Sequence, residues 1–177
     1  MISSRFAPEK KNAIALCWEG CVQAGLNTQV KLVVTGLSDS PESDEFRRMV
    51  SDSDQSEFVI LESFSDRKRL AALFHAADLA LFARPSISCQ EALGTGAYGV
   101  FADDGSMNWL LPTADLGETF TTGSPSALAD TIRRRVRVER VMDNRELERA
   151  TRAQSAAFLD YDTVIDTVID AVYHSGT

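Results

Sequence analysis

The segment Arg84–Gly105, RPSISCQEALGTGAYGVFADDG, places a carboxylate and several hydroxyls close to a strand end. An apolar run over 79–83 precedes it and another over 99–102 follows, which predicts strand, loop, helix and strand, with Glu91 in the first turn of the helix. Ligands of parallel α/β sheets sit beyond the carboxyl ends of strands, where helix N-termini present free N–H groups. A carboxylate there can accept hydrogen bonds from two hydroxyls of a sugar or ribose, one per oxygen.

These groups also have ordinary structural interpretations. The helix dipole alone favours a first-turn glutamate such as Glu91. Ser86 and Ser88 can cap the same helix or donate to a phosphate, and capping is the commoner role of serine at such a position. Asp103 and Asp104 follow a strand end, where a plain turn explains them as well as a ligand does. The residue types alone therefore leave the choice open.

Two cations, Arg5 and Lys10, fall at the end of the first expected strand and the start of the first expected helix. Arginine offers a planar fork of donors and lysine a point charge, a combination that suits a diphosphate. Lys10 and its neighbour Lys11 are equally explained as solvated residues at a helix start. The spacing of the two cations alone does not decide between these interpretations.

The sequence contains no other recognisable catalytic set. It has two histidines, and His75 ends an expected helix, where a cation is favourable for a purely structural reason. No Ser-His-Asp set, metal-ligand cluster or glycine-rich phosphate loop of standard spacing is present. Cys17 and Cys21 share one helix face, and buried thiols explain them better than a metal does. We therefore expect neither a metal nor a resident cofactor.

Composition narrows the classes of partner. The 177 residues are enough for one domain with its own core, and 44% hydrophobic and 25% charged residues are typical of a globular protein. A net charge of −8 argues against nucleic acid and against an anionic membrane surface as partners. No apolar run approaches the roughly 20 residues of a membrane helix, and no signal peptide is recognisable. Three cysteines without a secretory signal suggest a reducing, cytoplasmic setting.

Short apolar runs alternate with helical patterns along the chain. Helices are expected at 13–24, 45–51, 66–75, 108–111, about 125–141, 145–158 and 163–173, and strands at 30–35, 58–61, 79–83, around Val100 and at 119–122. Ser124 followed by Pro125 predicts a helix N-cap with proline at the first helical position. This alternation predicts an α/β fold: a single Rossmann-like domain whose parallel sheet of about six strands has helices on both faces, followed by a helical C-terminal tail. The abrupt start at Met1 suggests a domain cut from a larger protein.

Five motifs in this order resemble the C-terminal, donor-binding domain of retaining glycosyltransferases of the GT-B fold, glycosyltransferase family 4. The resemblance covers nearly the whole chain. The motifs are SRFAPEKK, VKLVVTG, LAALFHAADLALFARPS, EALGTGAYGVFADDG and, in the tail, AAFLDYDTVIDTVIDAVY. The fourth is similar to the family's Glu-Ala-Met-Ala-x-Gly-x-Pro-Val-Val-Ala-x-Asp-x-Gly.

The resemblance assigns roles to individual residues. Arg5 and Lys10 would bind the donor diphosphate and, by stabilising it as the leaving group, would be the catalytic residues. Glu91 would bind the ribose hydroxyls as the second glutamate of the family's Glu-x₇-Glu pair. Ser86, Ser88 and Gly36, which lies in the family's glycine turn after the second strand, would complete the donor-binding site.

The sequence also departs from the family. The stretch between the Pro-Ser turn and Glu91 is shorter than usual and lacks the family's first glutamate, so no group that would contact the transferred sugar is identifiable. Tyr98 and Gly99 stand where Pro-Val is common, and Trp109 falls near a later glutamate of the family. These departures bear on the sugar site more than on the fold.

The resemblance implies that residues 1–177 are the nucleotide-sugar (donor) binding domain of a glycosyltransferase. The parent enzyme would transfer a glycosyl group from a nucleotide diphosphate sugar, of UDP or GDP type, to a glycan, lipid or small-molecule acceptor with retention of configuration, as in polysaccharide biosynthesis. Its partner would be an N-terminal acceptor domain absent from this chain, and the isolated domain is expected to bind donor weakly and transfer nothing. The alternatives are a non-catalytic Rossmann-like interaction module and a nucleotide-sugar epimerase-like domain.

Overall fold

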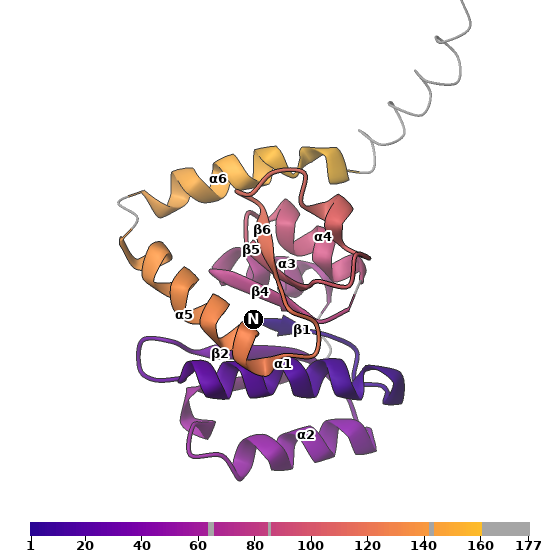
Figure 1. The fold of residues 1–177 in the computed structure, drawn as a ribbon. Helices are drawn as coiled ribbons and strands as arrows, with labels where there is room; N and C mark the ends of the chain where they lie inside the picture. Colours follow the sequence, from indigo (N-terminus) through magenta and orange to yellow (C-terminus); the bar gives the residue numbers. More distant parts are fainter. Residues whose placement is uncertain (64–65, 85, 142–143, 161–177) are drawn as a thin grey trace, which may run out of the picture.

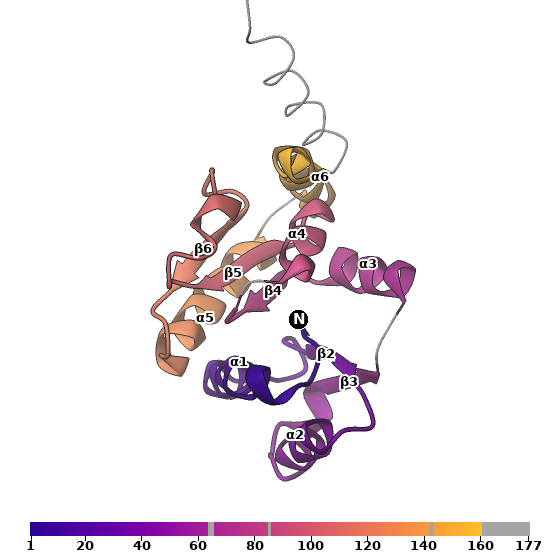
Figure 2. The same ribbon diagram turned by 90° about the vertical axis from the view of Figure 1, so that its right-hand side faces the viewer.

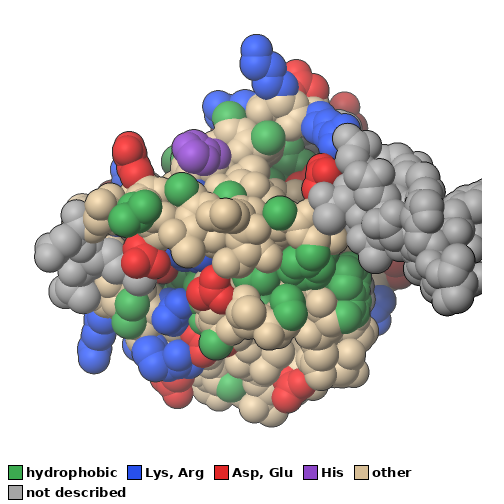
Figure 3. Space-filling view, turned by 90° about the horizontal axis from the view of Figure 1, so that it is seen from above, with side chains coloured by type: hydrophobic (Ala, Val, Ile, Leu, Met, Phe, Trp, Pro, Cys, Tyr) green, Lys and Arg blue, Asp and Glu red, His purple; other side chains and the backbone are tan. Residues whose placement is uncertain are grey.

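The computed structural model describes residues 1–63, 66–84, 86–141 and 144–160. The helix expected at 163–173 lies outside the described residues. No helix of the described ranges combines the length and the apolar character that crossing a membrane requires. On the face that Figure 3 shows, side chains of both charge signs are interspersed.

A parallel sheet of six strands forms the centre of the fold (Figure 1). Its strands are β1 (Ile2–Ser3), β2 (Leu32–Leu37), β3 (Val59–Ser63), β4 (Leu79–Phe82), β5 (Tyr98–Ala102) and β6 (Gly117–Phe120). Their order is β3-β2-β1-β4-β5-β6, and every neighbouring pair is parallel. The predicted Rossmann-like sheet is therefore confirmed, and its order reverses direction between β1 and β4.

Helices cover both faces of the sheet, as predicted (Figure 2). One face carries α1 (Lys11–Ala24), α2 (Pro41–Ser51) and α5 (Pro125–Val141), and the other carries α3 (Arg67–Ala76), α4 (Ile87–Gly94) and α6 (Arg145–Ser155). Short 3₁₀ turns are η1 (Pro8–Lys10), η2 (Ser56–Phe58), η3 (Asn108–Leu110) and η4 (Ala157–Leu159). Right-handed crossovers account for the placement of α1 to α4, because the chain moves outward from β1 in one direction and from β4 in the other.

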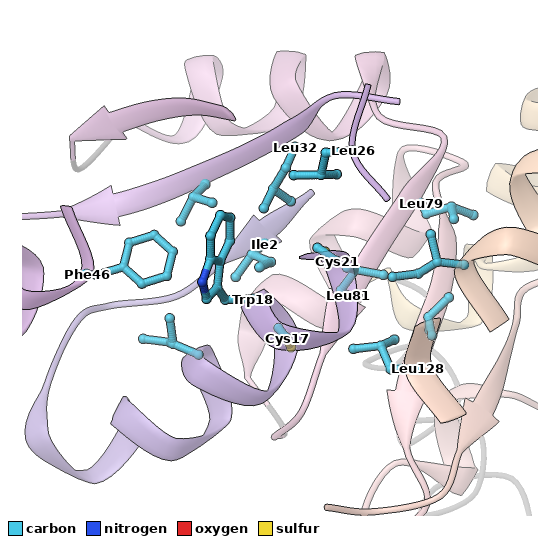
Figure 4. Packing of buried hydrophobic residues seen from close by; sticks show 14 of the residues in the cluster. Ile2, Cys17, Trp18, Cys21, Leu26, Leu32, Phe46, Leu79, Leu81 and Leu128 are labelled. Atoms are coloured by element: carbon cyan, nitrogen blue, oxygen red, sulfur yellow. The ribbon is translucent and has the colours of Figure 1, made fainter. Parts of the chain in front are cut away.

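Each face of the sheet has its own apolar core. Beneath α1 and α2, Trp18 packs edge-on against Phe46 with ring centroids 5.9 Å apart (Figure 4). On the other face, Phe82 stacks on Phe101 at 5.6 Å. All residues of β4 and β5 are buried, as expected for parallel strands covered on both faces.

Several element boundaries differ from the predictions for local reasons. α2 begins at Pro41 rather than near 45, because the Ser40 hydroxyl caps it by accepting from the Ser43 N–H at 3.2 Å. β2 continues through Gly36, which adopts a positive φ of 100° within the strand. β6 lies at 117–120, two residues before its expected place at 119–122. The Ser124 cap is confirmed: its hydroxyl accepts from the Ala127 N–H at 3.2 Å.

Candidate functional site

A small cleft opens where β1 and β4 end side by side, at the point where the strand order reverses. Its volume is ≈ 30 Å³, and its lining comes from the two strand ends, the start of α1 and the loop into α4. The polar residues of the lining are Ser3, Ser4, Lys10, Arg84 and Ser86. In open α/β sheets this crevice is where ligands bind. The lining brings together Lys10 and Ser86, two residues singled out from the sequence.

Lys10 ends the turn η1 and occupies the position before α1, where it is half-buried. Its N–H donates to the Ala7 carbonyl at 2.9 Å, which directs the chain into the helix. The next lysine, Lys11, forms an ion pair with Glu45 at 2.8 Å, whereas no carboxylate in the described part of the chain lies within 4.0 Å of the Lys10 ammonium. Lys10 is therefore the lysine of this pair that is available to an anion in the cleft.

Arg84 also lines the cleft, although it was not among the site residues predicted from the sequence. It lies two residues after the end of β4 and is exposed. One of its Nη groups donates to the Glu9 carbonyl at 3.2 Å, so the side chain bridges from the end of β4 to the turn before α1. A cation at the carboxyl end of a central strand was the sequence signal that could have identified it.

The amino end of α4 forms another wall. Ser86 has the extended backbone of an N-cap, yet its hydroxyl does not cap the helix; Oγ lies 3.6 Å from the Cys89 sulfur. The first N–H groups of a helix have no intrahelical acceptor, so they remain suited to an anion. Burial raises the pKa of the Cys89 thiol, and hydrogen bonding with Ser86 and the charge of Lys10 oppose that shift. Ser88 is half-buried in the first turn.

The remaining predicted residues lie outside the lining of the cleft. Arg5 is exposed just beyond β1, and Glu91 is half-buried. Glu91 is the fifth residue of α4 and so belongs to its second turn; the expected first-turn position was wrong, because the helix already begins at Ile87. Gly36 affects the site indirectly: a Cβ there would overlap the Ser4 carbonyl, so glycine lets β1 approach β2.

The aspartates after β5 form a turn. The Asp104 carboxylate accepts from the Ser106 N–H at 2.9 Å. Hydrogen bonds from the Ser106 hydroxyl and N–H lower the pKa of Asp104, and the charge of Arg84 adds to this effect. His75 is exposed at the end of α3. Among the described residues there is no group of three or more His, Cys, Asp or Glu side chains that could hold a metal.

The arrangement suits an anion with several oxygens. Two cations, Lys10 and Arg84, line the cleft together with Ser86, which precedes the first residue of α4. The cleft itself has room for little more than phosphate oxygens. The remainder of a larger ligand would lie outside it.

No protein-family model matches the chain, and no curated protein matches it in sequence. Solved structures do resemble it. The sucrose-phosphate synthase of Thermosynechococcus elongatus matches 99% of this chain and 45% of its own, with a TM-score of 0.73 and 15% identity. HepE of Anabaena, solved with UDP and glucose, matches 99% of this chain and 48% of its own, with a TM-score of 0.70 and 18% identity.

A third neighbour is the catalytic domain of the cholesterol-α-glucosyltransferase of Helicobacter pylori, with 88% of this chain and 95% of that one matched, a TM-score of 0.63 and 15% identity. The chain spans less than half the length of the other two. These neighbours are glycosyltransferases of the GT-B type, and the chain has the Rossmann-like fold of their C-terminal domain. At sequence identities of 15–18%, the similarity of the chain to these structures concerns the fold alone.

Proposed function

We propose that this chain is the donor-binding domain of a retaining GT-B glycosyltransferase of family 4 type. The observation that carries the proposal is the cleft between β1 and β4, where Lys10, Arg84 and the N-terminus of α4 converge. The fold shared with glycosyltransferases, one of them solved with UDP, supports the same assignment. The ligand would be the diphosphate of a nucleotide sugar.

In this proposal the chain's residues stabilise charge on the leaving diphosphate. Lys10 donates from one side of the cleft, and Ser86 and the N–H groups of the first turn of α4 donate from the other. Arg5 and Glu91, which lie outside the cleft, would meet the parts of the donor that extend over the rim, with Glu91 accepting from ribose hydroxyls. The scheme uses no metal.

Transfer would require a second domain to hold the acceptor. The proposed parent enzyme uses a UDP or GDP sugar, retains the anomeric configuration and acts in polysaccharide biosynthesis in the cytoplasm. Residues 1–177 alone are expected to bind the donor without transferring its sugar.

Isothermal titration of the chain with UDP, GDP and ADP tests the binding proposal. We expect one of them to bind in the micromolar to millimolar range, and Lys10→Ala to weaken it about tenfold or more, as loss of a charge-assisted hydrogen bond does. Lys31→Ala is the control, since it removes the same kind of side chain from an exposed position before β2, at the opposite edge of the sheet. Equal losses in both variants, or no binding of any nucleotide to the folded chain, would contradict the proposal.

A non-catalytic interaction module is the second candidate, and one observation favours it. Ile87 and Trp109 are 76% and 57% exposed and follow β4 and β5 at the carboxyl edge of the sheet. Large exposed apolar side chains can mark a protein interface. Absence of nucleotide binding, together with weaker partner binding in Ile87→Ser, would favour the module; nucleotide binding at Lys10 would favour the enzyme domain.

A further inference from the structure

The two edge strands of the sheet, β3 and β6, differ in what they present to solvent. Figure 2 shows them at opposite ends of the sheet. The middle residues of β6, Glu118 and Thr119, are polar, and its Phe120 is buried. Glu118 also forms ion pairs with Arg134 at 2.7 Å and with Arg135 at 3.5 Å. Polar and charged residues on an edge strand oppose pairing with another strand.

β3 presents an apolar edge instead. Ile60 and Leu61, at its centre, are 47% and 36% exposed. Among the large apolar side chains that the structure describes as exposed, these are the only two that are adjacent in the sequence. The charge of Glu62 is compensated within the chain by its ion pair with Arg69 of α3. An exposed apolar edge strand is a template for a further strand.

The hydrogen bonds of β2 show which backbone groups of β3 face outward. The Ser4 N–H donates to the Thr35 carbonyl at 3.2 Å, so Thr35 directs its backbone groups toward β1. Alternation then turns the backbone groups of Val34 toward β3, where Val34 is paired with Leu61. A residue in a parallel ladder bonds to the two residues that flank its partner, so the Leu61 N–H and carbonyl point away from β2. No other strand of the described ranges lies on that side.

The two ends of β3 carry opposite charges. Asp52, Asp54 and Glu57 precede the strand, are exposed and have no cation between them in the sequence. Arg67 and Lys68 follow the strand and are exposed in the first turn of α3. The helix dipole disfavours cations at that position, so a nearby anion would stabilise them. The edge of β3 is therefore acidic at its amino end and basic at its carboxyl end.

We propose that two copies of this chain associate through β3, antiparallel and about a two-fold axis at Leu61, so that one sheet continues through both copies. The Leu61 N–H of each copy donates to the Leu61 carbonyl of the other. The acidic end of each β3 lies beside the basic end of the other. This inference goes beyond the proposed function and does not rest on it. The proposed second domain would face the cleft between β1 and β4 and leave β3 open.

The backbone and the charges both select this arrangement. Outward-facing groups of one strand must meet outward-facing groups of the other, which places the two-fold axis on a residue of β3. An axis at Leu61, the middle residue, pairs the whole strand. An axis at Glu62 would pair less of it and would place like charges directly opposite each other, which is destabilising. A parallel arrangement would bring like charges together at both ends of the strand.

Sedimentation velocity of the full chain, from about 1 μM to 1 mM, tests the association. We expect a reversible equilibrium between monomer and dimer without larger species, because a two-fold pairing occupies the free edge. Leu61→Lys should weaken dimerisation about tenfold or more, since it places two ammonium groups opposite each other at the axis. Leu147→Lys is the matched control, because Leu147 of α6 is also an exposed leucine, at 59%. A chain that is monomeric throughout, or equal effects of the two substitutions, would overturn the proposal.

A charge-reversal cycle tests the antiparallel direction. Asp54 and Lys68 stand equally far from Leu61 in the sequence, so the proposed register places each beside the other residue of the second copy. Asp54→Lys and Lys68→Glu should each weaken dimerisation about threefold to tenfold, as expected for exposed charge pairs that occur twice in a dimer. The double variant should recover most of the loss, because the opposite charges are restored. Losses that add in the double variant would contradict the antiparallel arrangement.

Hydrogen exchange in the unsubstituted chain locates the interface and decides the matter if Leu61→Lys fails to fold. The Leu61 amide should exchange about tenfold more slowly or less at concentrations where the dimer predominates than in dilute solution, because its N–H is then hydrogen-bonded to the second copy. The Glu62 amide faces β2 and should exchange at the same rate at both concentrations. A dimer that leaves exchange at Leu61 unchanged uses another surface and would overturn the proposal.

Discussion

Gly36→Ala is expected to destabilise the domain far more than the same substitution at another glycine of positive φ. Gly36 has a φ of 100°, and a Cβ there would overlap the Ser4 carbonyl oxygen and lie 2.8 Å from its carbonyl carbon. Gly25, with a φ of 87°, has open space around an added Cβ. The two substitutions share the conformational cost of a left-handed alanine, so their difference isolates the contact between β1 and β2.

The expected loss of unfolding free energy has two parts, the conformational cost of a left-handed alanine and the steric overlap with Ser4. A residue other than glycine at positive φ costs about 1–2 kcal/mol, which is the whole cost expected for Gly25→Ala. At Gly36, carbon atoms normally about 3.5 Å apart would be 2.8 Å apart, and the overlap with the Ser4 carbonyl oxygen is greater still, so the end of β1 must shift by more than roughly 0.7 Å. Overpacking of this kind adds about 1–3 kcal/mol. Gly36→Ala should therefore lose about 2–5 kcal/mol of unfolding free energy.

Equilibrium urea unfolding, followed by far-UV circular dichroism, measures both variants against the unsubstituted chain. An additional loss of about 2 kcal/mol corresponds to a Tm about 4–8 °C below that of Gly25→Ala for a domain of this size. Nucleotide binding should weaken in Gly36→Ala as well, because Ser4 lines the cleft. If the two variants have unfolding free energies within about 0.5 kcal/mol of each other, the proposed contact does not constrain β1.

Three further predictions concern the framework of the domain. Arg152 and Glu139 form a buried bidentate pair at 3.1 and 3.2 Å, so Arg152→Leu should cost about 3–5 kcal/mol in urea unfolding, whereas adding Glu139→Leu should restore much of the loss. Burial raises the pKa of Cys17 and of Cys21 from 9.0 to about 12. The stability that the two neutral thiols contribute is fully present below pH 9 and is lost as the pH rises toward 12. The unfolding free energy from urea titrations should fall over this pH range, and it should fall less in a C17A/C21A variant. Ser40→Ala removes the cap of α2 and should cost about 1 kcal/mol, with an unchanged midpoint contradicting the capping contact.

Much of the architecture could be predicted because local signals agree with it. Apolar runs of strand length alternate with helical patterns, and Ser124-Pro125 marks the start of α5 where the structure has it. The predicted strand ends were less accurate, because hydrogen bonding to neighbouring strands determines where a strand ends. The sequence predicts that β2 stops at Gly36, whereas its pairing with β3 continues to Leu37.

The site was predictable only in part. Lys10 and Ser86, which the residue types and the family resemblance single out, both line the cleft. Arg84 lines the cleft as well but was not predicted, because the sequence does not show which cation after a strand turns toward the cleft.

The most direct test of nucleotide binding at the cleft is an NMR titration of the ¹⁵N-labelled chain with UDP, GDP and ADP. We predict that one nucleoside diphosphate shifts the backbone signals of Ser4, Lys10, Arg84 and Ser88, and that these shifts diminish in Lys10→Ala and Arg84→Ala. Signals of Lys31 and Val33, at the opposite edge of the sheet, should remain in place. Saturable shifts confined to that opposite edge, or none with any of the three nucleotides, would contradict the assignment of this domain as a donor-binding domain.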